Sequence, residues 1–163
     1  MVKTERATFG AGCFWGVEAS FREVKGVIST RVGFMGGWKK NPSYKLVCTG
    51  MTGHVEVCEV IYNPKKVSYK KLLETFWKIH DPTQKNRQGF DIGSQYRSVI
   101  FYYSLEQKKQ SEESLAKQQE KLLKKIQTQI VKSSEFYEAE EYHQNYLEKN
   151  KKETFNNPSY LSL

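Results

Sequence analysis

The chain has 163 residues. This is the size of a single domain with one main hydrophobic core, so residues 1–163 are expected to form one domain. A mean hydropathy of −0.69, and the lack of any uncharged apolar run of roughly 18–20 residues, argue against a membrane protein. The net charge of +8 raises the question of nucleic acid, but the 26 basic residues are interleaved with 18 acids and form no basic arm. Three cysteines, with no apolar signal-peptide core before them, indicate free thiols and a cytoplasmic location.

The first predicted elements are a strand over residues 4–9, a turn over residues 10–16 and a helix over residues 17–22. Glycines in the turn allow a sharp bend and the close approach of a ligand. Cys13 falls at the start of the helix, where unpaired N–H groups and the helix dipole favour a thiolate. A single cysteine at such a turn is more often a small buried residue, yet here two aromatic residues follow it directly and could line a pocket. The turn is therefore a candidate reactive site.

The rest of the chain alternates strands, loops and helices. A strand is expected at residues 27–34, a long loop that carries Tyr44 at residues 37–53, and an alternating strand at residues 54–62. The later elements are a helix capped by Ser68, an irregular stretch at residues 83–97, a strand at 98–103, a helix at 105–126, a strand near 129–132 and a helix around 139–149. The order β-α-β-β-α-β predicts an α+β two-layer sandwich with a split β-α-β (ferredoxin-like) core and extra C-terminal helices. The tail from about residue 153 is expected to be mobile.

Glu56 lies within an otherwise apolar strand, where burying an unpaired carboxylate would be costly. Burial would raise its pKa and make it a proton donor near neutral pH. The alternative is a glutamate that points into water from an edge strand, and the strand pattern alone favours neither. Tyr44, Asp91 and Tyr96 fall in loops, and a tyrosine hydroxyl in a pocket can donate to a polar oxygen, although packing is its commoner role. The sequence contains no metal-ligand spacing, phosphate-binding loop or dinucleotide fingerprint.

Four stretches of the sequence together resemble the peptide methionine sulfoxide reductases of the A type. They are residues 12–16, 41–44, 52–56 and 87–98, and two C-terminal segments, residues 135–137 and 141–144, also match. The match spans nearly the whole chain in the right order. It implies an α+β sandwich with an open pocket and an oxidoreductase that reduces the S epimer of methionine sulfoxide, free or in proteins. Such an enzyme repairs proteins damaged by oxidative stress.

The resemblance also implies a role for each candidate residue. Cys13 would be the nucleophile, which attacks the sulfoxide sulfur and becomes a sulfenic acid. Glu56 would be the acid that protonates the sulfoxide oxygen. The other matching residues are Tyr44 and Tyr96, which would hydrogen-bond this oxygen, Phe14 and Trp15, which would enclose the substrate methyl group, and Asp91, a polar residue near the pocket.

The chain departs from the many family members that carry a resolving cysteine in the C-terminal tail, because residues 154–163 contain none. It therefore resembles a one-cysteine version, in which an external thiol attacks the sulfenic acid. Glutaredoxin with glutathione, or thioredoxin, would supply that thiol, and no bound cofactor or metal is expected. Cys48 and Cys58 are interpreted as structural, and the chain is expected to be a monomer.

Two other classes of function remain open from the residues alone. A cysteine hydrolase could use Cys13 with His54, His143 and Asp91 as partners, although the chain is short for that class. A basic nucleic-acid-binding module would account for the net charge. Only the reductase interpretation uses Glu56 and the two tyrosines together.

Overall fold

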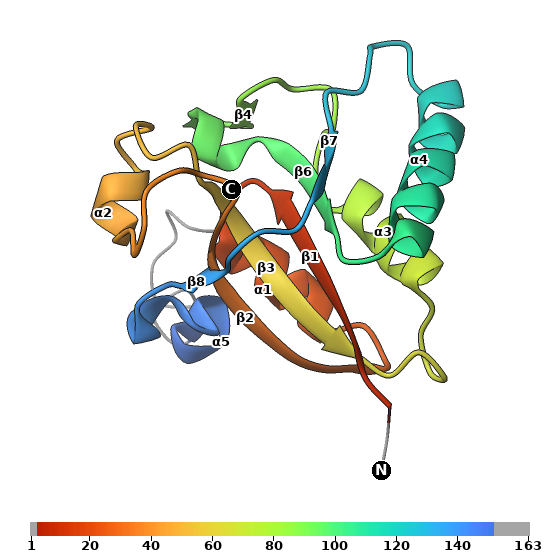
Figure 1. The fold of residues 1–163 in the computed structure, drawn as a ribbon, viewed down its shortest axis with the longest axis horizontal. Coiled ribbons are helices and arrows are strands. Elements are labelled where there is room, and N and C mark those ends of the chain that lie inside the picture. Colours follow the sequence, from red (N-terminus) through yellow and green to blue (C-terminus); the bar gives the residue numbers. More distant parts are fainter. Residues whose placement is uncertain (1–2, 152–163) are drawn as a thin grey trace.

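A computed structural model of the protein describes residues 3–151. Its larger sheet has six strands in the order β7-β6-β1-β3-β2-β8 (Figure 1). These strands are β1 (Glu5–Ala11), β2 (Val27–Met35), β3 (Val55–Tyr62), β6 (Ser98–Tyr102), β7 (Gln129–Lys132) and β8 (Tyr137–Glu138). The four central strands are all antiparallel to their neighbours within that group, and β7 pairs in parallel with β6. The order β6-β1-β3-β2 is that of a split β-α-β core, so the predicted α+β fold is confirmed.

Helices cover one face of the sheet. The helices are α1 (Phe14–Arg22), α2 (Tyr44–Val47), α3 (Tyr69–Lys78), α4 (Leu105–Glu120) and α5 (Tyr146–Lys149). Buried side chains of α1 and α3 form the main core with inward-facing residues of β1, β2 and β3. The α4 helix packs beside α3, where Trp77 Nε1 donates to Ser114 Oγ at 2.7 Å (Figure 1). No helix within residues 3–151 has both the length and the apolar character needed to cross a membrane.

A smaller core occupies the opposite face of the sheet. It contains Met35, Val55, Val57, Val99 and Phe101. The segment that follows β7 crosses this face, and Phe136 packs against the cluster. The alternation predicted for residues 54–62 is therefore confirmed, because odd-numbered valines and even-numbered residues of β3 belong to different cores.

Short elements were the ones that sequence reasoning missed. The irregular stretch at residues 83–97 contains a hairpin of β4 (Arg87–Gln88) and β5 (Asp91–Ile92), followed by the 3₁₀ helix η1 (Ser94–Tyr96). The loop at residues 37–53 contains α2, which Ser43 caps by accepting from Leu46 N. A second 3₁₀ helix, η2 (Glu141–His143), precedes α5.

Two predicted helices were too long. The helix expected to reach residue 126 ends at Glu120, because the Gln119 amide accepts from Ile126 N and donates to Lys124 O, which stabilises a turn. The helix expected around residues 139–149 is replaced by η2 and α5, which follow β8. There the Gln144 amide bonds both Val32 N and Val32 O, so the chain runs along the edge of β2 instead of coiling. The tail expected to be mobile lies outside the described residues.

Candidate active site

The turn between β1 and α1 positions Cys13. Gly12 has φ +96°, and a Cβ at this position would lie 2.9 Å from the Gln88 side chain, so the bend requires glycine. Cys13 occupies the N-cap position of α1 with no side-chain capping bond, which leaves its thiol available. The helix begins at Phe14, three residues earlier than the hydrophobic pattern predicted.

The thiol of Cys13 is less acidic than its place at a helix N-terminus predicts. Burial, and then the negative charge of Glu56, raise the pKa of Cys13 to about 12. Hydrogen bonds from the backbone N–H groups of Trp15 and Gly16 act in the opposite direction but are outweighed. The expectation of a thiolate was therefore wrong for the free protein. Protonation of Glu56 would remove one of the causes of the raised pKa.

Glu56 points into the protein beside this turn. Its side chain is 1% exposed, so the water-facing alternative is excluded. Oε1 accepts a hydrogen bond from Phe14 N at 3.2 Å, whereas Oε2 is buried with no hydrogen-bond partner among residues 3–151. Burial, with a smaller contribution from the charge of Asp91, raises the pKa of Glu56 to about 8. At neutral pH the carboxyl therefore holds a proton that it can donate.

Two tyrosines share the electrostatic environment of Glu56. Tyr44 is the first residue of α2, and Tyr96 is the last residue of η1. Burial raises the pKa of both hydroxyls, and the charge of Glu56 raises both further. Cys13 also raises the pKa of Tyr96. Both phenols therefore stay protonated as hydrogen-bond donors, within electrostatic range of Glu56.

Asp91 lies at the outer edge of the same group. It begins β5, its side chain is exposed, and its charge raises the pKa of Cys13, Glu56 and Tyr96. The fold therefore brings together residues from the β1–α1 turn, β3, α2, the β4–β5 hairpin and η1.

An aromatic wall adjoins the thiol. Phe14 is completely buried and packs on the rings of Phe34 and Tyr44, with centroids 5.7 and 6.1 Å apart. Trp15 is half-buried and stacks on Tyr146 of α5 at 3.9 Å. Of the two side chains, Trp15 is the one that retains an accessible surface.

His143 is a part of this wall that sequence reasoning did not place. Its ring is fully buried, and Nδ1 accepts a hydrogen bond from Trp15 Nε1 at 2.9 Å. The ring also lies 4.3 Å from that of Tyr44. The sequence named His143 only as a possible partner of a cysteine hydrolase and as part of one of the two C-terminal segments that carried the resemblance.

The other two cysteines differ from one another. Cys58 is fully buried in the main core, which agrees with a structural role. Cys48 is exposed and its side chain raises the pKa of Tyr44, so it lies at the edge of the site.

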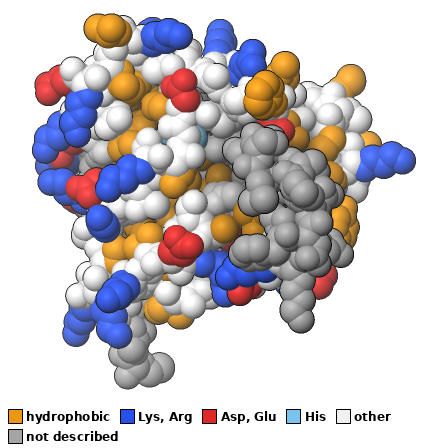
Figure 2. Space-filling model, turned by 180° about the vertical axis from the view of Figure 1, so that it is seen from behind, with side chains coloured by type: hydrophobic (Ala, Val, Ile, Leu, Met, Phe, Trp, Pro, Cys, Tyr) orange, Lys and Arg blue, Asp and Glu red, His pale blue; other side chains and the backbone are white. Residues whose placement is uncertain are grey.

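The arrangement does not supply the partners of a cysteine hydrolase. His54 is buried, its Nδ1 accepts from Gly37 N, and its Nε2 hydrogen-bonds Lys39 O, so both ring nitrogens are occupied. His143 uses Nδ1 on Trp15. Within residues 3–151, no cluster of three or more His, Cys, Asp and Glu side chains is placed to hold a metal ion. Lysines and arginines are dispersed among acids over the face in Figure 2.

Comparisons with known proteins point to one family. Residues 5–160 match the family model described as peptide methionine sulfoxide reductase. The chain is 60% identical over 148 residues to peptide methionine sulfoxide reductase MsrA of Methanothermobacter thermautotrophicus, covering 90% of this chain and 88% of the relative. It is 56% identical to MsrA of Geobacter metallireducens, covering 89% and 91%.

Solved structures agree with the sequence matches. The reduced form of Mxr1 from Saccharomyces cerevisiae superposes with a TM-score of 0.88 at 40% identity, over 91% of this chain and 87% of that one. Methionine sulfoxide reductase A of Corynebacterium diphtheriae gives a TM-score of 0.83 at 40% identity, over 91% and 76%. Mxr1 in complex with Trx2 gives a TM-score of 0.65 at 29% identity, over 86% of this chain and 84% of that one.

Proposed function

Since the chain belongs to the peptide methionine sulfoxide reductase family, and therefore reduces methionine sulfoxide in the repair of oxidised proteins, we propose that Cys13 is its nucleophile. The sulfur of Cys13 attacks the sulfoxide sulfur, and the oxygen passes to Cys13. The substrate sulfur gains two electrons and leaves as methionine, while the Cys13 thiol loses two electrons and becomes a sulfenic acid. The single thiol proton accounts for the hydrogen of the new S–OH group.

Glu56 is the proposed general acid. The supporting observation is its buried Oε2, which has no partner among the described residues and lies on a carboxyl whose pKa is about 8. A sulfoxide oxygen that entered the site would accept this proton as the S–O bond weakens. The Cys13 proton then restores the carboxyl. Tyr44 and Tyr96, both protonated, donate hydrogen bonds to the same oxygen.

The aromatic wall is proposed to hold the substrate methyl group. Trp15 offers the accessible ring, and Phe14 supports it from the core. Because a polar group binds the oxygen on one side and a ring binds the methyl on the other, the site distinguishes the two sulfoxide epimers, and we assign it to the S epimer. Asp91 is proposed to act as the polar residue at the pocket edge.

Recycling is proposed to use an external thiol, because the sequence given has no cysteine after Cys58. A small thiol such as glutathione would form a mixed disulfide with Cys13, which glutaredoxin resolves, or thioredoxin would reduce Cys13 directly. The Mxr1 structure with Trx2 supports a protein reductant of this kind. We further propose that the chain works as a single-domain cytoplasmic monomer without a bound cofactor.

The test is a single turnover without reductant. With one equivalent of methionine sulfoxide, the wild type should yield about one equivalent of methionine, and dimedone should label Cys13. Cys13→Ser should yield no methionine, whereas Cys48→Ser should behave as the wild type. A Cys13–Cys48 or Cys13–Cys58 disulfide as the main product would overturn the one-cysteine assignment, and methionine formation by Cys13→Ser would overturn the nucleophile.

A further inference from the structure

Exposed hydrophobic side chains gather on the two loops that border the site. Residues 3–151 expose eleven large hydrophobic side chains, and five of them lie on the loop at residues 37–53 or on the β4–β5 hairpin. The four most exposed of these, which we name the apolar rim, are Trp38 (72%), Met51 (73%), Phe90 (93%) and Ile92 (71%). Single exposed hydrophobic residues are ordinary, but a group on neighbouring loops indicates a binding surface.

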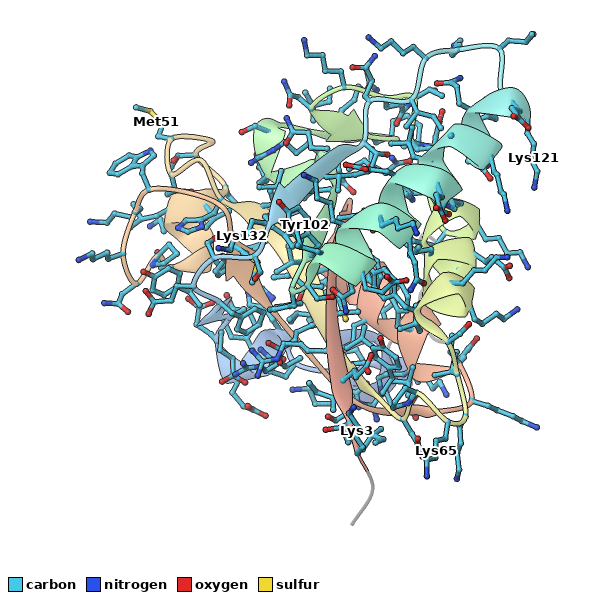
Figure 3. All side chains as sticks on the ribbon, turned by 45° about the vertical axis from the view of Figure 1, so that its right-hand side comes forward. Lys3, Met51, Lys65, Tyr102, Lys121 and Lys132 are labelled. Carbon is cyan, nitrogen blue, oxygen red and sulfur yellow. The ribbon has the colours of Figure 1, made fainter. Side chains whose placement is uncertain are left out.

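Each loop is in direct contact with the site. Phe90 and Ile92 are the sequence neighbours of Asp91, and Gln88 of the same hairpin packs against Gly12, next to Cys13. On the other loop, Cys48 lies near enough to Tyr44 to raise the pKa of its hydroxyl, and Met51 follows Cys48 three residues later. Figure 3 shows the Met51 side chain standing out from the surface at this edge of the molecule.

The two loops are also joined to one another. The Arg97 guanidinium donates to Gly53 O at 3.1 Å and to Ser94 O at 2.8 Å, which links the end of one loop to η1 behind the hairpin. Trp38 packs on the same Gly53, where a Cβ would lie 3.3 Å from its Cδ1, and Trp38 N donates to Thr52 O. The hydrogen bonds of Arg97 therefore connect the loop of Trp38 and Met51 to η1, which contains Tyr96 and follows the hairpin of Phe90 and Ile92.

We propose that the apolar rim binds the polypeptide on either side of the methionine sulfoxide residue and favours substrates whose neighbouring side chains are apolar. The proposal rests on the proposed function. A peptide substrate that inserts one side chain beside Cys13 must leave the site across the surrounding loops, and these loops offer hydrophobic groups that no part of residues 3–151 covers. Burying them against apolar neighbours would be favourable.

The preferred substrate on this basis is an unfolded or locally opened protein. Apolar residues that flank a methionine are normally inside a folded protein and become available only when the chain opens. The rim would therefore direct repair toward damaged, partly unfolded proteins, while free methionine sulfoxide would use the inner site alone.

Two lysines of the loop at residues 37–53 suggest a competing preference, for substrates with acidic flanking residues. Lys39 and Lys40 follow Trp38 and are exposed, so acidic flanking residues could be attracted to the same edge. Such attraction would weaken with added salt, whereas contact with the apolar rim would not. Peptides of different flanking sequence separate the two.

The experiment compares three synthetic peptides with one methionine sulfoxide, flanked on each side by two leucines, two serines or two glutamates, and free methionine sulfoxide. For the wild type, kcat/KM should be about tenfold higher for the leucine than for the serine peptide, mainly through KM. The paired variants Trp38→Ser with Met51→Ser, and Phe90→Ser with Ile92→Ser, should each lose most of this advantage. Both paired variants should reduce free methionine sulfoxide with a kcat/KM within about twofold of the wild-type value.

The matched control removes exposed hydrophobic groups elsewhere. Leu105 and Leu123 are 80% and 107% exposed, on and just after α4, at the opposite side of the molecule from α2 (Figure 1). Leu105→Ser with Leu123→Ser should keep the preference for the leucine peptide.

Equal kcat/KM values for the leucine and serine peptides, with both reduced through Cys13, would overturn the proposed role of the apolar rim and leave the proposed function intact. A salt-sensitive preference for the glutamate peptide would also overturn it. Failure of Cys13 to react with any substrate would instead remove the proposed function on which the rim rests.

Discussion

Two glutamates of β3, three residues apart on opposite faces of the sheet, have very different surroundings. Glu56 and Glu59 are 1% and 3% exposed. Glu59 accepts from Arg31 Nε at 2.7 Å and Arg31 Nη2 at 3.1 Å, with Arg6 Nε 3.8 Å away. Glu56 accepts only the Phe14 N–H, and its second oxygen has no partner in the described part of the chain.

The two buried carboxyls therefore differ in their partners and not in their burial. The two-point bond to Arg31 balances the charge of Glu59 and raises the pKa of Arg31. Among residues 3–151 no cation lowers the pKa of Glu56, so burial is uncompensated and raises this pKa to about 8. A proton retained on a buried carboxyl next to a thiol is available for chemistry.

The largest expected effect comes from removing the proton that distinguishes Glu56. Glu56→Gln should slow sulfenic acid formation by about 10²–10⁴-fold, the usual size of general acid assistance. Single-turnover rates of methionine release measure this directly. Glu56→Asp should retain part of the rate, and equal rates for Glu56→Gln and the wild type would assign the acid to another group.

The pH dependence sharpens the same comparison. Because the pKa of Glu56 is about 8, its acid form is lost as the pH rises through 8, and assistance should fall about tenfold for each further pH unit. Thiolate formation at Cys13 acts oppositely, since its pKa of about 12 makes it more reactive as the pH rises. The ratio of wild-type to Glu56→Gln rates isolates the acid. This ratio should be constant below pH 7 and should decline above pH 8.

Stability should respond to pH through the same carboxyl. Its pKa is raised from 4.5 in the unfolded chain to about 8, so the folded protein binds this proton more tightly. The stability that this tighter proton binding contributes to the folded protein is fully present below pH 4.5 and is lost as the pH rises through 8. Between pH 5 and pH 9, Glu56→Gln should therefore gain about 2–4 kcal/mol relative to the wild type in urea unfolding. A difference that does not change with pH would contradict the raised pKa.

A smaller effect is expected at the aromatic wall, where the buried Nε2 of His143 has no hydrogen-bond partner among the described residues and lies 3.7 Å from Glu140 Oε2. His143→Ala removes the acceptor for Trp15 Nε1 and should raise KM for methionine sulfoxide about three- to tenfold. If His143 acts by orienting Trp15, the same substitution should change little in a Trp15→Phe protein. Additive effects of the two substitutions would show that His143 acts by another route.

The smallest effect on activity is expected at Glu59, the second glutamate of the pair. Glu59→Gln should leave single-turnover rates within about twofold, because Glu59 lies on the face of the sheet opposite to Glu56. It should lower the free energy of unfolding by about 1–2 kcal/mol, since Arg31 is part-exposed and can regain water. Thermal and urea unfolding give this value. A large loss of activity in a folded Glu59→Gln protein would remove the distinction between the two glutamates.

The sequence could predict much of the fold because local rules decide it. The two-residue alternation of β3 and the helical spacing of α3, with Ser68 as its cap, follow from short-range geometry, and both were confirmed. Elements stabilised by distant partners were missed. The edge strand β8 depends on backbone bonds to β2, and α5 is placed by contacts such as Tyr146 on Trp15.

The sequence by itself determined that a cysteine follows a glycine turn, that a glutamate interrupts an apolar strand and that tyrosines occupy the nearby loops, because these are properties of residue type and order. Only the tertiary structure decided that Glu56 is buried with no cation beside it in the described part of the chain, and that burial outweighs the helix N-terminus at Cys13. It also decided that His143 lies behind Trp15 and that the apolar rim borders the site. The physical reason is that burial and charge balance depend on atoms far apart in the chain, such as those of Phe14 and Glu56, 42 positions apart, which no local pattern records.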